Sequence, residues 1–130
     1  MKLRFFRCDI CGKVVAVLSQ ADVPTDCCGQ PMRELVANTT DGAKEKHVPV
    51  SRREAEKLHV TVGSAPHPMT PAHWIEWIAL QTDRGISFRA LRPGDAPAVC
   101  FTVCPDEETE EVYAYCNLHG LWASPFSMTK

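Results

Sequence analysis

The chain has 130 residues, of which 45% are hydrophobic, so it can form one ordinary domain or a small domain beside a medium one. Its formal net charge of -2 argues against a general nucleic-acid or anionic-membrane binder, because such proteins present a basic field. No apolar run approaches the roughly 18 residues that a membrane span needs, and the basic start lacks an apolar signal core. We therefore expect a cytoplasmic protein, mature from residue 1, whose seven cysteines bind metal rather than form disulfides.

Residues 1–36 are predicted to form a first, small unit around four cysteines. Cys8 and Cys11 form one pair and Cys27 and Cys28 the other, and a glycine follows each pair. Glycine suits a tight turn with positive φ, and four thiols are the right number for a tetrahedral all-thiolate site. The segment is too short to be held by apolar burial alone, so metal binding would supply much of its folding energy. Short strands are expected at residues 3–7, 13–18 and 32–36.

Residues 37–130 are predicted to form an antiparallel β-sandwich of about seven short strands with no long helix, because turn signals recur at regular spacing. Residues 37–44 are polar and form the linker. Val48 precedes a proline, so we expect it and its neighbours to be extended, not helical. The charged residues 52–57 are expected to form a turn or a short helix. The predicted strands are residues 58–62, the run after His73, and residues 86–91, 98–103, 111–116 and 121–123.

Cys116 and His119 are the first candidate ligands in this second unit. They lie three residues apart in Cys116-Asn117-Leu118-His119-Gly120, at the end of a predicted strand, and can turn toward one metal ion. Thiolate and neutral imidazole are donors that transition metals prefer over calcium or magnesium.

Three upstream histidines are the companions of this pair. His67 lies between two prolines that stiffen the backbone and exclude it from a central strand, His73 follows six residues later, and His47 precedes Val48. If all of them converge with Cys116 and His119, the site has four nitrogens and one sulfur. These five donors exceed the four ligands of a closed structural zinc site, so their number favours a redox metal.

Other reactive or aromatic side chains are expected to have structural roles. His59 is interpreted as an ordinary strand residue, and residues 105–110 as a solvated acidic hairpin tip. Cys100 and Cys104 are expected to be buried small hydrophobic residues. Trp74 and Trp77 should lie on opposite faces of a strand, so at least one belongs to the core. The other is a candidate to shelter the site from water, but core packing is the favoured interpretation for both.

Two resemblances to known proteins can be read from these motifs. Cys8-x-x-Cys11 with Cys27-Cys28-Gly29 resembles the desulforedoxin domain, a four-cysteine iron module of the rubredoxin type, although zinc accepts the same four thiolates. Residues 45–50, 63–69, 73–78 and 116–122 resemble superoxide reductase. Together the two parts resemble the two-centre family, desulfoferrodoxin, over essentially the whole chain.

This resemblance implies an all-β protein with a desulforedoxin-like domain at residues 1–36 and an immunoglobulin-like superoxide reductase sandwich at residues 37–130, assembled as a homodimer. It also implies one iron at the four-cysteine centre and a second iron with one open position. The implied ligands of the second iron are equatorial His47, His67, His73 and His119 and axial Cys116.

The implied activity is the one-electron reduction of superoxide to hydrogen peroxide at a ferrous centre, without dioxygen release and with electrons from a rubredoxin-like donor. Lys46 is implied to steer superoxide and help hold bound peroxide. Glu45 is implied to occupy the open position in the ferric state. Without the resemblance, both side chains would be interpreted as ordinary surface charges.

Two other classes of function remain compatible with the residues. One is an electron-transfer or structural metalloprotein without turnover. Binding of azide or cyanide at the second centre would argue against this class. The other is a zinc-based regulatory or nucleic-acid module, which metal analysis would decide. The role of the four-cysteine centre, as electron relay or structural support, also stays open.

Overall fold

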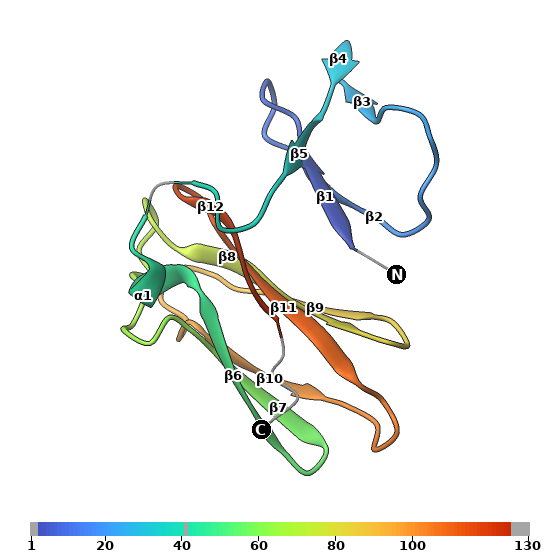
Figure 1. Cartoon of the computed structure of the whole chain (residues 1–130). Helices are drawn as coiled ribbons and strands as arrows, with labels where there is room; N and C mark the ends of the chain where they lie inside the picture. The colour runs from blue at the N-terminus through green and yellow to red at the C-terminus, as the bar shows by residue number, and fades with distance from the viewer. Residues whose placement is uncertain (1–2, 41, 126–130) are drawn as a thin grey trace. The chain divides into compact units, whose positions relative to one another are not determined.

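The computed structural model describes residues 3–40 and 42–125 and divides the chain into two compact units, residues 1–36 and 37–130. In the described part of the chain the only helix is a single turn, and the strand pairs are antiparallel (Figure 1). No helix among these residues is long and apolar enough to cross a membrane. The all-β prediction is confirmed.

The first unit is a three-stranded sheet with a short hairpin. The central strand β1 (Arg4–Arg7) pairs with β2 (Val14–Val17) on one side and with β5 (Arg33–Leu35) on the other. The hairpin consists of β3 (Asp26–Cys27) and β4 (Gln30–Pro31). The three predicted strands are confirmed to within one or two residues, whereas the hairpin is too short for any strand pattern to reveal.

The second unit is a sandwich of two antiparallel sheets, with strand orders β10-β7-β6 and β12-β11-β8-β9. Alternate residues of both sheets point inward. Leu58, Val60 and Val62 come from one sheet, while Ile78 and Val112 come from the other, and all are at most 1% exposed. The strands are β6 (Pro49–Glu54), β7 (Lys57–Val62), β8 (Ile75–Thr82), β9 (Ile86–Ala90), β10 (Ala98–Thr102), β11 (Thr109–Cys116) and β12 (Gly120–Pro125).

Two backbone predictions in this unit are wrong in part. The residues before Val48 form the helical turn α1 (Lys44–His47), although Val48 itself is extended, with φ of -73° and ψ of 123°. The charged residues 52–57 include the end of β6, which is an edge strand. Because one face of an edge strand meets water, charged side chains can alternate with partly buried ones there.

The interpretation of Cys100 and Cys104 as buried residues is also wrong. Cys100 is half-buried, and Cys104 is exposed and lies beyond the end of β10. Trp77 is buried in β8 and stacks on Tyr115, with ring centroids 5.4 Å apart, which confirms one tryptophan as a packing residue. Trp74 is half-buried just before β8.

Candidate metal centres

The first cysteine pair lies in a tight turn after β1. The amide of Cys8 donates to the carbonyl oxygen of Lys13 (2.9 Å), and the amide of Gly12 donates to the carbonyl oxygen of Cys8 (2.8 Å). Gly12 has φ of +84°, a left-handed conformation that glycine adopts without steric cost. The turn therefore presents the sulfur atoms of Cys8 and Cys11 toward the same region.

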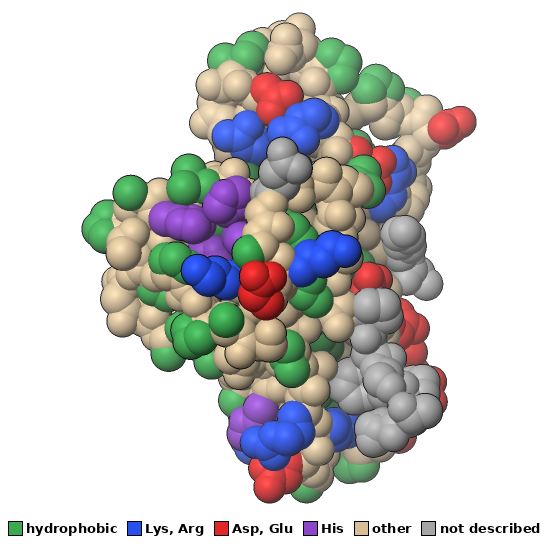
Figure 2. Space-filling view, turned by 60° about the vertical axis from the view of Figure 1, so that its left-hand side comes forward, with side chains coloured by type: hydrophobic (Ala, Val, Ile, Leu, Met, Phe, Trp, Pro, Cys, Tyr) green, Lys and Arg blue, Asp and Glu red, His purple; other side chains and the backbone are tan. Residues whose placement is uncertain are grey.

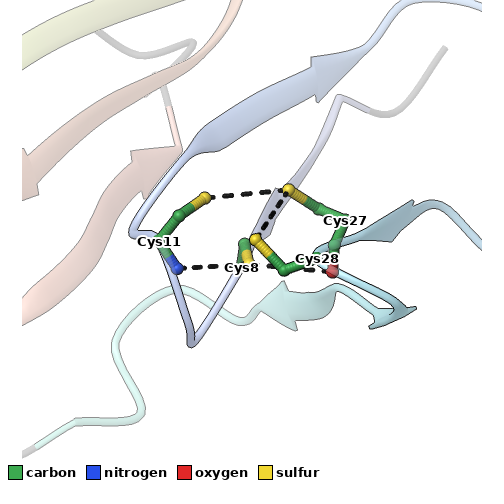
Figure 3. Close-up of side chains that lie close together, drawn as sticks. All are labelled: Cys8, Cys11, Cys27 and Cys28. Atoms are coloured by element: carbon green, nitrogen blue, oxygen red, sulfur yellow. Dashed lines mark hydrogen bonds between the residues drawn. The ribbon is translucent and has the colours of Figure 1, made fainter.

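The second pair lies in the β3–β4 turn and faces the first (Figure 3). The sulfur of Cys27 is 3.7 Å from that of Cys11 and 3.9 Å from that of Cys28. Thiolates about 2.3 Å from one tetrahedral metal ion are about 3.8 Å apart, so the cluster has the dimensions of such a site. Cys28 and the following Gly29 both have positive φ, 54° and 78°, which confirms the tight turn expected there.

The protonation of the four thiols shows why a cation fits between them. The N–H of Cys11 points at the sulfur of Cys8 and is the main cause that lowers the pKa of Cys8 to about 6. Once Cys8 is ionised, its sulfur is the main cause that raises the pKa of Cys28 to about 12. Full ionisation of the four thiols is therefore unfavourable without a cation between them, and both iron and zinc meet this need.

The second cluster gathers donors from five places in the sandwich. The donor atoms of His47, His67, His73 and Cys116 all lie within 4.8 Å of one another. The Nδ1 atom of His119 is 3.0 Å from Nε2 of His47 and 3.8 Å from the sulfur of Cys116. Two nitrogens about 2.1 Å from one metal and at right angles are about 3.0 Å apart. The structure thus brings together the five side chains that the sequence singled out.

The four imidazole rings follow one another around a square. The ring centroids of neighbours are 4.6 Å apart for His47 and His67, 4.7 Å for His67 and His73, 5.0 Å for His73 and His119, and 4.8 Å for His119 and His47. The His47–His73 diagonal is longer, 6.4 Å. Neighbouring rings are nearly perpendicular, with interplanar angles of 72–84°. Four nitrogens can therefore surround one point, with the sulfur as a fifth donor.

Two of the histidines are oriented through their other ring nitrogen. Nδ1–H of His47 donates to the carbonyl oxygen of Ala43, and Nδ1–H of His67 donates to that of Pro68, both at 2.7 Å. These bonds select the tautomer that leaves the Nε2 lone pair available. Nε2 of His67 and of His73 is buried without a hydrogen-bond partner. Since an unsatisfied buried polar atom is costly, these two atoms fit a site that holds a metal ion.

Burial also sets the charge state of the cluster. It is the main cause that lowers the pKa of His67 to about 4 and that lowers the pKa of His47 and of His73. These imidazoles are therefore neutral near pH 7, which is the form that binds metal. Burial raises the pKa of the Cys116 thiol, against the opposing effect of the backbone N–H groups of His119 and Leu118. A metal ion would have to displace the proton of this thiol.

Trp122 borders the cluster. Its indole is 1% exposed and stacks on His47, with ring centroids 4.9 Å apart at 24°. Its Nε1–H donates to the carbonyl oxygen of His119 (3.1 Å). This role was not predicted from the sequence. The only available signal was the position of Trp122 three residues after a candidate ligand.

The two charged candidates, Glu45 and Lys46, lie on α1 directly before His47 and are exposed. Burial and the neighbouring imidazoles are larger causes of the lowered pKa of His47 and of His73, and the positive charge of Lys46 lowers both further. The ammonium group of Lys46 therefore lies near the cluster. Figure 2 shows a group of histidine side chains at the surface, with hydrophobic, basic and acidic side chains close by on the same face, and a separate histidine near the lower end. An anion could therefore approach the histidines from solvent past a positive charge.

Comparisons with known proteins agree with this arrangement. The desulfoferrodoxin N-terminal domain matches residues 1–35, and the desulfoferrodoxin family matches residues 39–125. Desulfoferrodoxin from Nitratidesulfovibrio vulgaris is 48% identical over 118 residues, which are 90% of this chain and 91% of that protein. The superoxide reductase structure from Treponema pallidum has a TM-score of 0.81 at 36% identity, covering 95% of this chain and 99% of that one. A one-iron superoxide reductase from Giardia intestinalis has a TM-score of 0.57 at 31% identity, covering 65% of this chain and 100% of that one. The chain belongs to the desulfoferrodoxin family.

Proposed function

We propose that this protein is a superoxide reductase. It combines superoxide with one electron and two protons to give hydrogen peroxide, and it releases no dioxygen. The observation that carries this assignment is the convergence of four imidazole nitrogens and the Cys116 sulfur in one cluster. The superoxide reductases among its structural neighbours support it.

The two compact units are assigned as two metal domains. In the first, residues 1–36, the four cysteines would hold iron, or zinc in recombinant material. In the second, residues 37–130, iron would be held by His47, His67, His73, His119 and Cys116. When bound, iron would supply the electron that superoxide takes up, because it can change from the ferrous to the ferric state. The five protein donors would leave room for one further ligand from solution.

The side chains around the second cluster favour an anionic substrate. Neutral imidazoles add no negative charge, so the ferrous site with its single thiolate keeps a net positive charge. We assign Lys46 to attract superoxide toward the cluster and to hold the peroxide product by its ammonium group. Attraction of this kind raises association rates by about 10-fold or more. We assign Glu45, its neighbour on the exposed side of α1, as the carboxylate that closes the open position in the oxidised state.

The partners and location follow the same assignment. We infer a rubredoxin-like electron donor and a homodimeric assembly. All seven cysteines are free thiols, which fits a reducing compartment and therefore the cytoplasm.

The stoichiometry of the reaction with superoxide tests this function. Iron-loaded, reduced protein is mixed with a known amount of superoxide, and hydrogen peroxide and dioxygen are both measured. A reductase yields one peroxide per superoxide and no dioxygen. Half as much peroxide, with dioxygen, formed faster than in a protein-free control, would identify a dismutase instead. The same products at the rate of that control would leave an electron-transfer or structural metalloprotein.

A further inference from the structure

Two ligands of the second cluster, His73 and Cys116, lie where the regular pairing of two sheet strands ends. His73 precedes β8, and Cys116 ends β11, the neighbouring strand (Figure 1). The β8–β11 register shifts between Tyr115 and Cys116, and Cys116 pairs with Ile75 as the last pair at this end of the ladder. Beyond it, the amide of Asn117 donates to the carbonyl oxygen of Trp74 at 3.2 Å.

The side chain of Asn117 joins the two segments beyond this last pair, and it uses both the oxygen and the nitrogen of its amide. Its Oδ1 accepts from the backbone N–H of Trp74 (2.9 Å), and its Nδ2 donates to the carbonyl oxygen of Ala72 (3.0 Å). Ala72 and Trp74 are the two residues on either side of His73. One side chain thus holds the backbone on both sides of a candidate ligand, and it extends from the turn that carries Cys116 and His119.

The ring of His73 depends on its backbone more than the rings of His47 and His67 do. The rings of His47 and His67 are fixed through Nδ1 to backbone carbonyls. Among the described residues, the ring of His73 makes no such hydrogen bond, and its Nε2 is buried without a hydrogen-bond partner. The placement of that nitrogen therefore follows from the backbone of residues 72–74. The side chain of Asn117 holds this backbone on both sides of His73, and two backbone hydrogen bonds with Thr70 (2.9 and 3.1 Å) hold His73 itself.

We propose that Asn117 is a positioning residue that fixes His73 relative to Cys116 and His119. The carboxamide of Asn117 accepts with its oxygen and donates with its nitrogen, so it serves both backbone groups at once. An aspartate keeps the acceptor and loses the donor, and an alanine loses both. This inference rests on the proposed second metal centre.

The test compares Asn117→Ala with a matched control, Asn38→Ala. Asn38 also makes two side-chain hydrogen bonds to backbone in the same unit, to the N–H and the carbonyl oxygen of Ala123, both at 3.0 Å. Reduced, iron-loaded proteins are equilibrated with a graded ferrous chelator and then oxidised. The iron left at the second centre is read from its thiolate-to-ferric absorption band, with the features of the four-cysteine centre as internal reference.

We expect Asn117→Ala to weaken iron binding at the second centre about 10- to 100-fold and to shift its absorption band. Asn38→Ala should leave both unchanged, even if it lowers thermal stability. Asn117→Asp, which keeps the bond to Trp74, guards against failure of the alanine variant to fold and should show a smaller band shift. Wild-type affinity and spectrum in both Asn117 variants would overturn the proposal, as would an equal effect of Asn38→Ala. A wild-type protein without the second-centre band would instead refute the proposed function.

Discussion

Gly63 is the position where a single added methyl group should disturb the second cluster most. A Cβ atom there would lie 2.5 Å from the carbonyl oxygen of Ala65, 2.7 Å from that of Glu45 and 2.7 Å from the carbonyl carbon of Lys46. These are backbone atoms, so no side chain can turn away to make room. Gly63 also has φ of +82°, in the left-handed region.

The cost of Gly63→Ala can be worked out from these contacts. An alanine in the left-handed region costs about 1–2 kcal/mol. Relief of the clash would separate α1 from the loop that carries His67, and would break the bonds from Gly63 N–H to Val48 (3.0 Å) and from Ala65 N–H to Glu45 (2.8 Å). At about 1 kcal/mol each, these bring the total loss in unfolding free energy to about 3–4 kcal/mol.

Gly94→Ala provides the matched control. Gly94 has φ of +96°, yet no atom lies within 4 Å of the position that a Cβ atom would take, so only the conformational cost of about 1–2 kcal/mol applies. Denaturant unfolding of the metal-free proteins can be followed by tryptophan fluorescence, because all three tryptophans belong to residues 37–130. Gly63→Ala should lose about 2 kcal/mol more than Gly94→Ala. Equal losses would refute the idea that Gly63 holds α1 in place.

Three further predictions concern charge. Lys46→Ala should slow the second-order reaction with superoxide about 10-fold at low ionic strength and by less in salt, and it should leave the iron spectrum intact. Lys44→Ala, on the same helix, should have a smaller effect on the rate. An unchanged rate of the Lys46→Ala variant at low ionic strength would exclude steering by Lys46. Glu45→Ala should alter the ferric spectrum but keep the rate within about twofold, since steering depends on Lys46, and a large loss of rate would contradict its assigned role. The metal-free protein should lose stability as pH falls from 7 toward 4. The pKa of His67 is about 4 when folded and about 6.5 when unfolded, so the unfolded state binds the extra proton in this window and up to about 3 kcal/mol is lost. Unfolding free energies that match at pH 7.5 and pH 5 would count against this.

Local patterns made the strands and the cysteine turns predictable. The glycines after Cys11 and Cys28 signal positive φ whatever surrounds them, and both have it. The alternation of Leu58, Val60 and Val62 likewise indicates one buried strand face, which the core confirms. These features depend on residues that are neighbours in the sequence, so they can be predicted from one sequence alone.

Features that depend on tertiary contacts could not be predicted in this way. The helical turn α1 is stabilised by the bond from Ala65 N–H to Glu45 and by the ring of His47 bonding Ala43, and no local pattern encodes these. The stacking of Trp122 on His47 joins residues 75 positions apart. The candidate ligands themselves were identified by residue type and family resemblance, whereas their square arrangement depends on tertiary contacts between α1, the loop of His67 and the ends of β8 and β11.

The most direct test of the two-centre account is the metal content and visible spectrum of the ferricyanide-oxidised protein, compared with a Cys116→Ser variant. We expect about two irons per chain in the wild type and a thiolate-to-ferric band beyond the features of the four-cysteine centre. The variant should lose that band and keep those features. A band that survives Cys116→Ser, or zinc alone after reconstitution with ferrous iron, would contradict the assignment of an iron centre to the four histidines and Cys116.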